Sequence, residues 1–417
     1  MVSARRTAIA RRTKRVWGYW RAETRTLRQG LVALALSTLA SFIAGLTLGH
    51  LTGTLTLLPG LLVLIPAAVG MRGTIFGAIG ARLGTSAAAG LFEVSLDRSG
   101  VLYRNVEVSI LTTLMSSLWL AMLAKLAVAV LGGASISLWS LVTISVVGGL
   151  LGSVLILLVT LGLTIVSYRR GYDLDSVATP IVTALGDMGT LPTLYLATFI
   201  ARNDVINGVV AGICVILAVA ALARAVITSV PGVRRIVLEM TAVMLLTPLL
   251  DIAAGAILQA KQPSLTLLPG LLILIPPFVS QAGALGGILS SRLTSKLQLG
   301  VITARGRPES PALIDMSLVA AEALVIFLAI GALGFALARW TGLATPGATA
   351  MIGGTALAGL LTLPLILATG YYVAILTSRF GLDPDDQSVP IITSLMDLAG
   401  VVAIFIAMSL SGVFANG

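Results

Sequence analysis

The chain has 417 residues, of which 57% are hydrophobic and 11% are charged, and its mean hydropathy is +1.03. Soluble proteins average about 25% charged residues, so this composition excludes a soluble globular protein and indicates one embedded in lipid. At about 20 apolar residues for each membrane crossing, the length accommodates on the order of ten helices and leaves no room for a sizeable soluble domain.

The chain has a net charge of +10, and the positions of its basic residues indicate a membrane-topology signal rather than a nucleic-acid-binding surface. Nine of the 27 Lys and Arg residues fall between Arg5 and Arg28, ahead of the first apolar run. Residues 1–30 are therefore predicted to form a basic cytoplasmic tail that orients the chain and contacts anionic membrane lipid. We expect no nucleic-acid partner.

Apolar runs divide the first half of the chain into five predicted membrane helices. The first run is longer than the hydrophobic part of a signal peptide, and equally apolar runs follow it, so we interpret it as a membrane span. The five spans lie near residues 31–51, 55–80, 106–131, 138–167 and 178–201.

The second half repeats the first with a constant offset. LTLLPGLLVLIP begins at Leu55 and LTLLPGLLILIP at Leu265, and 265 − 55 = 210. DLDSVATPIVTALGD begins at Asp173 and DPDDQSVPIITSLMD at Asp383, and 383 − 173 = 210 again. Two distant blocks with one offset argue against a chance similarity of Leu- and Ala-rich sequence. The repeat predicts partner spans near residues 237–259, 265–290, 313–338, 346–377 and 388–414.

An apolar run at residues 206–230 has no partner in the repeat. Five spans alone would invert the second copy, and one additional crossing restores its orientation. We therefore predict an all-α integral membrane protein of about 11 spans, with two parallel five-helix repeats related by a pseudo-two-fold axis along the membrane normal. The predicted parts are the tail at 1–30, a first transmembrane domain at 31–203, a connecting helix at 204–231 and a second transmembrane domain at 232–417.

Basic residues in the loops predict the orientation of this multi-pass protein in the cell membrane. With the N-terminus in the cytoplasm and the C-terminus outside, the outer loops hold only Arg202, Lys261 and Arg339. The cytoplasmic loops hold the larger set, as the positive-inside rule requires: Arg98, Arg104, Arg169, Arg170, Arg234, Arg235, Lys296, Arg305, Arg307 and Arg379.

Two acidic residues deep in predicted spans mark a candidate ion path. Asp187 and Asp397 are repeat-related, since 397 − 187 = 210, and each lies well inside the last span of its half. A carboxylate at mid-bilayer costs about 2.5–3.5 kcal/mol on insertion scales. Two that face each other repel, and one tends to stay protonated unless a cation lies between them. Mg²⁺ typically uses one or two carboxylates while keeping several waters. We predict that Asp187 and Asp397 are paired metal ligands.

Candidates for lining the path come from two repeated features. A Pro and a Thr share a helical face with each aspartate. A Pro- and Gly-containing span begins at Pro66 and again at Pro276, and interrupted spans at matching positions of two halves indicate a substrate path, although glycines also serve ordinary helix packing. The pore-lining candidates are Pro180, Thr183, Pro390, Thr393, Gly70, Gly73, Gly283 and Gln281.

Other acids are weaker candidates. Asp251 lies mid-span and its repeat partner is Ser41, so it breaks the symmetry; it and Glu322 are candidates for a secondary ion or coupling site, or else are hydrogen-bonded structural acids. Four acids at the cytoplasmic ends of the last spans either stabilise helix N-termini or form a cytoplasmic vestibule for divalent ions: Asp173, Asp175, Asp383 and Asp385.

These residues carry a family resemblance. The pattern D-x(6)-P-x-x-T-x(3)-D, from Asp173 to Asp187 and from Asp383 to Asp397, resembles the last-span motif of MgtE-type magnesium transporters. The run P-A-x-x-G-x-[KR]-G from Pro66 resembles the eukaryotic solute-carrier relatives of MgtE, in which two such domains are fused. The resemblance implies a five-helix unit used twice around one pore, with Asp187 and Asp397 facing the ion and one chain acting as a monomer with internal pseudo-dimer symmetry.

The residues and the resemblance together predict transport of a divalent cation, above all Mg²⁺, driven by the membrane potential or a coupled gradient. We expect no enzymatic activity and no cofactor, with Mg²⁺ taken as the substrate. Two alternatives stay open: Na⁺- or H⁺-coupled Mg²⁺ exchange, which Asp251 would favour, and transport of another divalent metal such as Mn²⁺ or Co²⁺.

Overall fold

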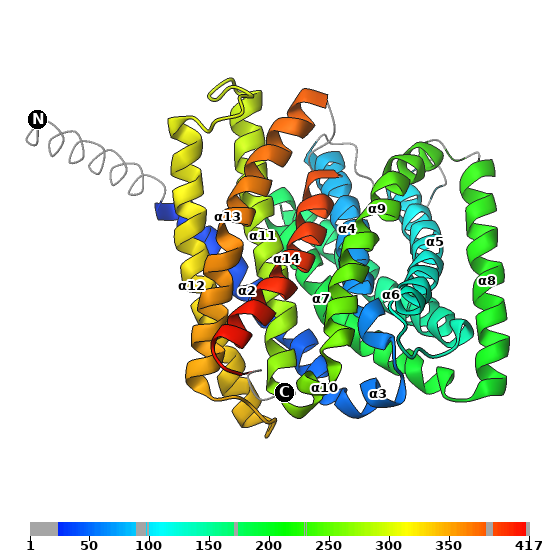
Figure 1. The fold of residues 1–417 in the computed structure, drawn as a ribbon. Helices are drawn as coiled ribbons and strands as arrows, with labels where there is room; N and C mark the ends of the chain where they lie inside the picture. Colours follow the sequence, from blue (N-terminus) through cyan, green and yellow to red (C-terminus); the bar gives the residue numbers. More distant parts are fainter. Residues whose placement is uncertain are drawn as a thin grey trace, which may run out of the picture.

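The computed structural model describes residues 24–88, 97, 100–170, 174–228, 230, 232–380 and 387–413. All regular structure within these ranges is helical, and Figure 1 shows the long helices side by side in one bundle. Ten of the described helices are long and apolar enough to cross a membrane. The predicted all-α membrane class is confirmed.

The two halves present matching series of helices. The first half comprises α2 (Thr24–His50), α3 (Thr52–Leu57), α4 (Leu61–Ala88), α5 (Val101–Val130), α6 (Leu138–Arg170) and α7 (Leu174–Ala201). α8 (Asp204–Ile227) connects it to the second half. The second half comprises α9 (Val233–Ala260), α10 (Gln262–Leu267), α11 (Gly270–Gln298), α12 (Ser310–Trp340), α13 (Ala348–Phe380) and α14 (Val389–Leu410).

The predicted spans 55–80 and 265–290 were wrong at their first turns. In each half a short helix, α3 or α10, precedes the long one, and the chain leaves the helical region at Leu58 (φ −123°, ψ 72°) and at Leu268 (φ −125°, ψ 66°). Both residues precede a proline, which disfavours the α conformation of the residue before it. In the first half Gly60 follows with φ +90°, a left-handed conformation that glycine adopts readily.

The interruptions expected at Pro66 and Pro276 were also wrong, because α4 and α11 continue through their internal prolines. Proline still removes one backbone donor from a helix. Pro277 cannot bond the carbonyl of Ile273 four residues before it, and that carbonyl lies against Gly45 of α2. The proline therefore frees a carbonyl at a helix crossing instead of breaking the span.

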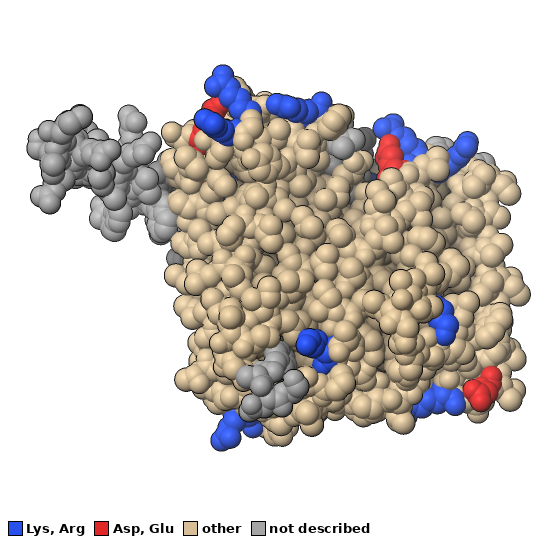
Figure 2. All heavy atoms as spheres, in the orientation of Figure 1, with Lys and Arg blue, Asp and Glu red and all other residues tan. Residues whose placement is uncertain are grey.

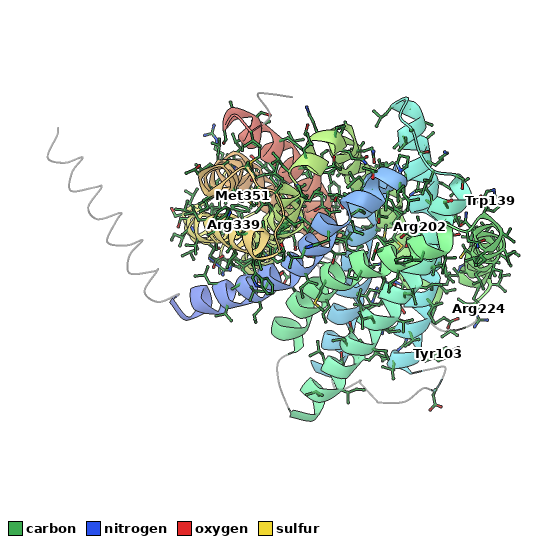
Figure 3. The ribbon with its side chains drawn as sticks, turned by 90° about the horizontal axis from the view of Figure 1, so that it is seen from below. Tyr103, Trp139, Arg202, Arg224, Arg339 and Met351 are labelled. Carbon is green, nitrogen blue, oxygen red and sulfur yellow. The ribbon has the colours of Figure 1, made fainter. Side chains whose placement is uncertain are left out.

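The first helix of each half packs against the other half. α2 lies along α11, and α9 lies along α4. Figure 3 shows α2 running into the group formed by second-half helices. At the two crossings a side chain on Gly45 would overlap the Ile273 carbonyl, and one on Gly255 would overlap the Val63 carbonyl. Gly255 follows Gly45 by 210 positions and Ile273 follows Val63 by 210 positions, so the two crossings are equivalent.

Consecutive long helices alternate in direction, and α2 and α9 both run toward the lower end of Figure 1. Figure 2 shows the visible charged side chains toward the two ends of the bundle, with a broad uncharged belt between them. This distribution fits a molecule whose middle lies in the hydrocarbon layer.

α8 lies at the edge of the bundle, beside α5 and α6. Figure 3 shows Arg224 of α8 and Trp139 of α6 at this edge. Two polar contacts attach the helix: Arg224 pairs with Glu107 of α5 at 2.9 Å, and the Asn207 side-chain amide donates to the Ser140 hydroxyl of α6 at 3.0 Å. α8 therefore adds a crossing without entering the centre.

Candidate ion-binding site

Asp187 lies on α7 in the middle of the bundle and is 6% exposed. Its Oδ2 atom accepts a hydrogen bond from the Ser41 hydroxyl of α2 at 2.8 Å and another from the Ser280 hydroxyl of α11 at 2.6 Å. Because α11 belongs to the second half, this carboxylate joins the two halves.

Asp397 lies on α14 next to a second acid, Asp251 of α9. A methyl group on Gly70 of α4 would lie 2.9 Å from Asp251 Oδ2 and 3.4 Å from Asp397 Oδ2. Both carboxylates therefore reach the same point on the α4 backbone, and α4 comes from the first half. Asp187 is close enough to Asp397 to interact with it electrostatically.

Asp251 is 1% exposed, and neither of its carboxylate oxygens completes a well-formed hydrogen bond within the described part of the chain. Ser394 and Asp397 lie within interaction range of it but do not reach good hydrogen-bond geometry. A buried acceptor without a well-formed hydrogen bond is costly in an apolar environment, which makes Asp251 a candidate for binding a further partner.

The three aspartates do not form a closed cage. Within the described residues, no group of three or more His, Cys, Asp or Glu side chains is arranged to hold a metal ion. An arrangement of one or two carboxylates suits a cation such as Mg²⁺ that keeps several of its waters.

The predicted pore-lining residues divide into two groups. Gly70 faces the carboxylates, and Gln281 is buried and donates from its amide to the Ser37 hydroxyl of α2 at 3.2 Å. Gly73 and Gly283 instead lie at close helix contacts, Gly73 beside Gly186 of α7 and Gly283 against Thr393.

The remaining candidates make other contacts or lie outside the described residues. Pro390 is buried in the first turn of α14, and Thr393 donates to its carbonyl at 3.0 Å. Glu322 of α12 faces Arg292 of α11 at 3.8 Å and also approaches Gly30 of α2. Asp173, Asp383 and Asp385, and the side chains of Asp175, Pro180 and Thr183, lie outside the described part of the structure.

Sequence reasoning missed the serines that surround Asp187. Ser41 and Ser280 carry no charge, and serine is common in membrane helices, so neither is conspicuous by type. The offset of 210 was the available signal, because it relates Ser41 to Asp251 and Ser280 to Gly70, both candidates in their own right.

Comparison with known proteins identifies the family to which this arrangement belongs. A family model described as MgtE, divalent cation transporter, matches residues 65–198 and 275–407, together well over half of the chain. The chain belongs to the MgtE family of divalent cation transporters. The two MgtE segments begin 275 − 65 = 210 residues apart, which is the offset of the repeat.

Among curated proteins, this MgtE-family chain is similar to solute carrier family 41 member 3 of the rat and of the mouse. The identities are 25% and 26% over 361 residues, which cover 82% of this chain and 77% and 73% of the two relatives. No solved structure matches the chain. The suspected resemblance to MgtE and its fused solute-carrier relatives is confirmed.

Proposed function

We propose that this chain transports Mg²⁺ through a path between its two halves, with Asp187 and Asp397 as ligands of the ion. The observation that carries the proposal is the matched position of these two acids: they are repeat-related, and each lies against a helix contributed by the opposite half. Membership of a divalent cation transporter family supports the substrate class.

The chemistry of the site favours a hard cation that retains water. Oxygen atoms surround the two aspartates, from the carboxylate of Asp251 and from the hydroxyls of Ser41 and Ser280. Mg²⁺ prefers oxygen ligands and gives up its waters reluctantly, so serine hydroxyls can hold the retained water shell. Acidic side chains inside membrane spans commonly mark ion pathways.

Ion flux into proteoliposomes containing the full-length protein tests the proposal. We expect Asp187→Asn and Asp397→Asn each to reduce Mg²⁺ flux strongly, because each removes one negative charge from the path while keeping the shape of the side chain. Glu107→Gln is the matched control, since Glu107 is an acid in a membrane helix that pairs with Arg224 at the edge of the bundle.

Undiminished flux in the double variant Asp187→Asn, Asp397→Asn would contradict the ligand assignment. A comparable loss of flux in Glu107→Gln would also contradict it, because the effect would then follow from any lost acid. Parallel measurements with Mn²⁺ and Co²⁺ identify the preferred metal.

A coupled exchanger is the second candidate function, and the buried carboxylate of Asp251 is the observation that favours it. An acid present in one half only can bind a coupling ion such as Na⁺ or H⁺ separately from the transported metal. Mg²⁺ flux that follows an imposed Na⁺ or H⁺ gradient at zero voltage supports exchange, whereas flux that follows voltage alone supports a channel.

The proposal includes a layout in the cell membrane. The basic tail at 1–30 and the acids Asp173, Asp175, Asp383 and Asp385 would face the cytoplasm, where the acids form a vestibule that concentrates divalent ions. The domains at 31–203 and 232–417, with the connecting helix at 204–231, would form the path within a single chain, and the C-terminus would lie outside.

A further inference from the structure

Asp187 and Asp397 each lie at an acidic position formed by three helices. The helices at the two positions are equivalent in the repeat, but the side chains that they contribute differ. Ser41, Ser280 and Asp187 form the first position. Adding 210 to Ser41 and Asp187 gives Asp251 and Asp397, and subtracting 210 from Ser280 gives Gly70, which are the residues of the second position. Each position therefore takes one residue from a first helix, one from the crossing helix of the opposite half and one from a last helix.

The first position is complete without an ion. Two hydroxyls donate to the same oxygen of Asp187, at 2.8 and 2.6 Å. Hydrogen bonds to a charged acceptor are stronger than those between neutral groups, so they offset much of the cost of burying this carboxylate.

The second position lacks the counterparts of both hydroxyl donors, and Ser394 is the neighbouring hydroxyl instead. A carboxylate, Asp251, stands where the first position has the Ser41 hydroxyl, and Gly70 stands where it has the Ser280 hydroxyl. Asp251 Oδ2 and Asp397 Oδ2 lie 2.9 and 3.4 Å from the point that a Gly70 methyl would occupy, so the two oxygens are no more than 2.9 + 3.4 = 6.3 Å apart.

An oxygen–oxygen distance within this limit is compatible with a shared cation. An ion between the two oxygens can contact both directly or contact one directly and the other through water, given metal–oxygen distances of about 2.0–2.1 Å for Mg²⁺. Asp251 contributes two buried oxygens without hydrogen-bond partners among the described residues. Two carboxylates this close repel each other in apolar surroundings unless positive charge lies between them.

We propose that Asp251 and Asp397 form an asymmetric seat for a divalent cation beside the bare backbone of Gly70. Asp187, whose carboxylate accepts two hydrogen bonds, adds negative charge near this seat and contacts the ion only at another point of its path. This inference rests on the proposed function and makes it more specific: the cation binds most tightly at the second position, between Asp251 and Asp397.

The internal repeat supplies the matched variants for a test. Asp251→Ser combined with Gly70→Ser turns the second position into a copy of the first, and shortening Asp251 makes room for the added side chain. Ser41→Asp combined with Ser280→Gly performs the reverse change at the first position. Binding of Mn²⁺ and of Mg²⁺ to the purified full-length protein is measured by titration calorimetry.

We expect the first double variant to weaken Mn²⁺ and Mg²⁺ binding by about 10-fold or more, the loss seen even when residues that only support a metal ligand are changed. The reverse double variant is expected to raise the number of bound Mn²⁺ ions from one to two. Wild-type affinity in Asp251→Ser, Gly70→Ser would overturn the proposal, as would a reverse variant that binds no additional ion.

The isosteric variant Asp251→Asn separates ion binding from folding. Without divalent cation its melting temperature should equal or exceed that of the wild type, because one of two repelling charges is gone. Its stabilisation by added Mg²⁺ should be smaller, since the stabilisation that a ligand gives grows with the logarithm of its affinity. A lower melting temperature without cation would show a structural role for Asp251 and would contradict the seat.

Flux measurements keep this inference distinct from the proposed function. If Asp187→Asn and Asp397→Asn together leave flux intact, the proposed function fails. If Asp397→Asn abolishes flux while Asp251→Asn binds and transports Mg²⁺ as the wild type does, only the seat fails.

Discussion

Arg72 shows how the two halves have diverged at single residues. It is 2% exposed on α4, donates from Nη1 to the Ala68 carbonyl, and reaches toward Gly149 of α6 and Ser117 of α5. Its repeat partner is Ala282, and the partner of Ser117 is Phe327, whose ring fills the matching space over Gly359. In the first half the large residue is on α4 and the small one on α5. In the second half the small residue is on α11 and the large one on α12.

This exchange predicts coupling between residues 72 and 117. Ser117→Phe alone should destabilise the protein by about 1–3 kcal/mol, because the added ring overpacks the space that Arg72 occupies. Adding Arg72→Ala recreates the second-half combination and should recover most of the loss. Melting temperatures of the two single variants and the double variant measure the coupling; simple additivity would show that the two side chains do not share this space.

At the scale of helices, the close crossings of α2 with α11 and of α9 with α4 hold the two halves together. Gly45 and Gly255 permit these crossings because each lies against a carbonyl of the opposite half. Ser41 and Asp251 lie one helical turn before these glycines. The crossings therefore also set how far the two acidic positions are from the opposite half.

Gly45→Ala and Gly255→Ala are each expected to lower the melting temperature and reduce Mg²⁺ flux, because the added methyl group forces the crossing helices apart at a cost of about 1–3 kcal/mol. Gly212→Ala on α8 is the matched control, since nothing lies within 4 Å of a methyl group there. If all three variants unfold at the same temperature, the crossings are less tightly packed than described.

The sequence predicts which segments form helices far better than it predicts which helices pack against one another. An unbroken apolar run defines a span because lipid imposes a minimum length, and Pro59 and Pro269 displaced only the first turns of α4 and α11. Helix faces toward lipid and toward protein are both apolar, so no pattern indicated that α2 packs on α11. The contact of Asp187 with Ser280 depends on that packing and could not be anticipated.

At the scale of the whole molecule, orientation in the membrane can be tested with the one native cysteine removed. In a Cys214→Ser background we expect Ala134→Cys to react with a membrane-impermeant maleimide on intact cells, because the positive-inside rule places its loop outside. Gly306→Cys should react only after lysis. Both positions are exposed, so the opposite labelling pattern would reverse the predicted orientation.

Because the first helix of each half packs against the other half, the helices come together in a set order during synthesis. α2 is complete at His50, but α11 is complete only at Gln298, which is 298 − 50 = 248 residues later. At about 5–20 residues per second, roughly 12–50 s separate the two. For that interval the face of α2 that carries Ser37, Ser41 and Gly45 has no α11 to pack against. A polar membrane surface therefore stays uncovered by α11 until more than two thirds of the chain has been synthesised.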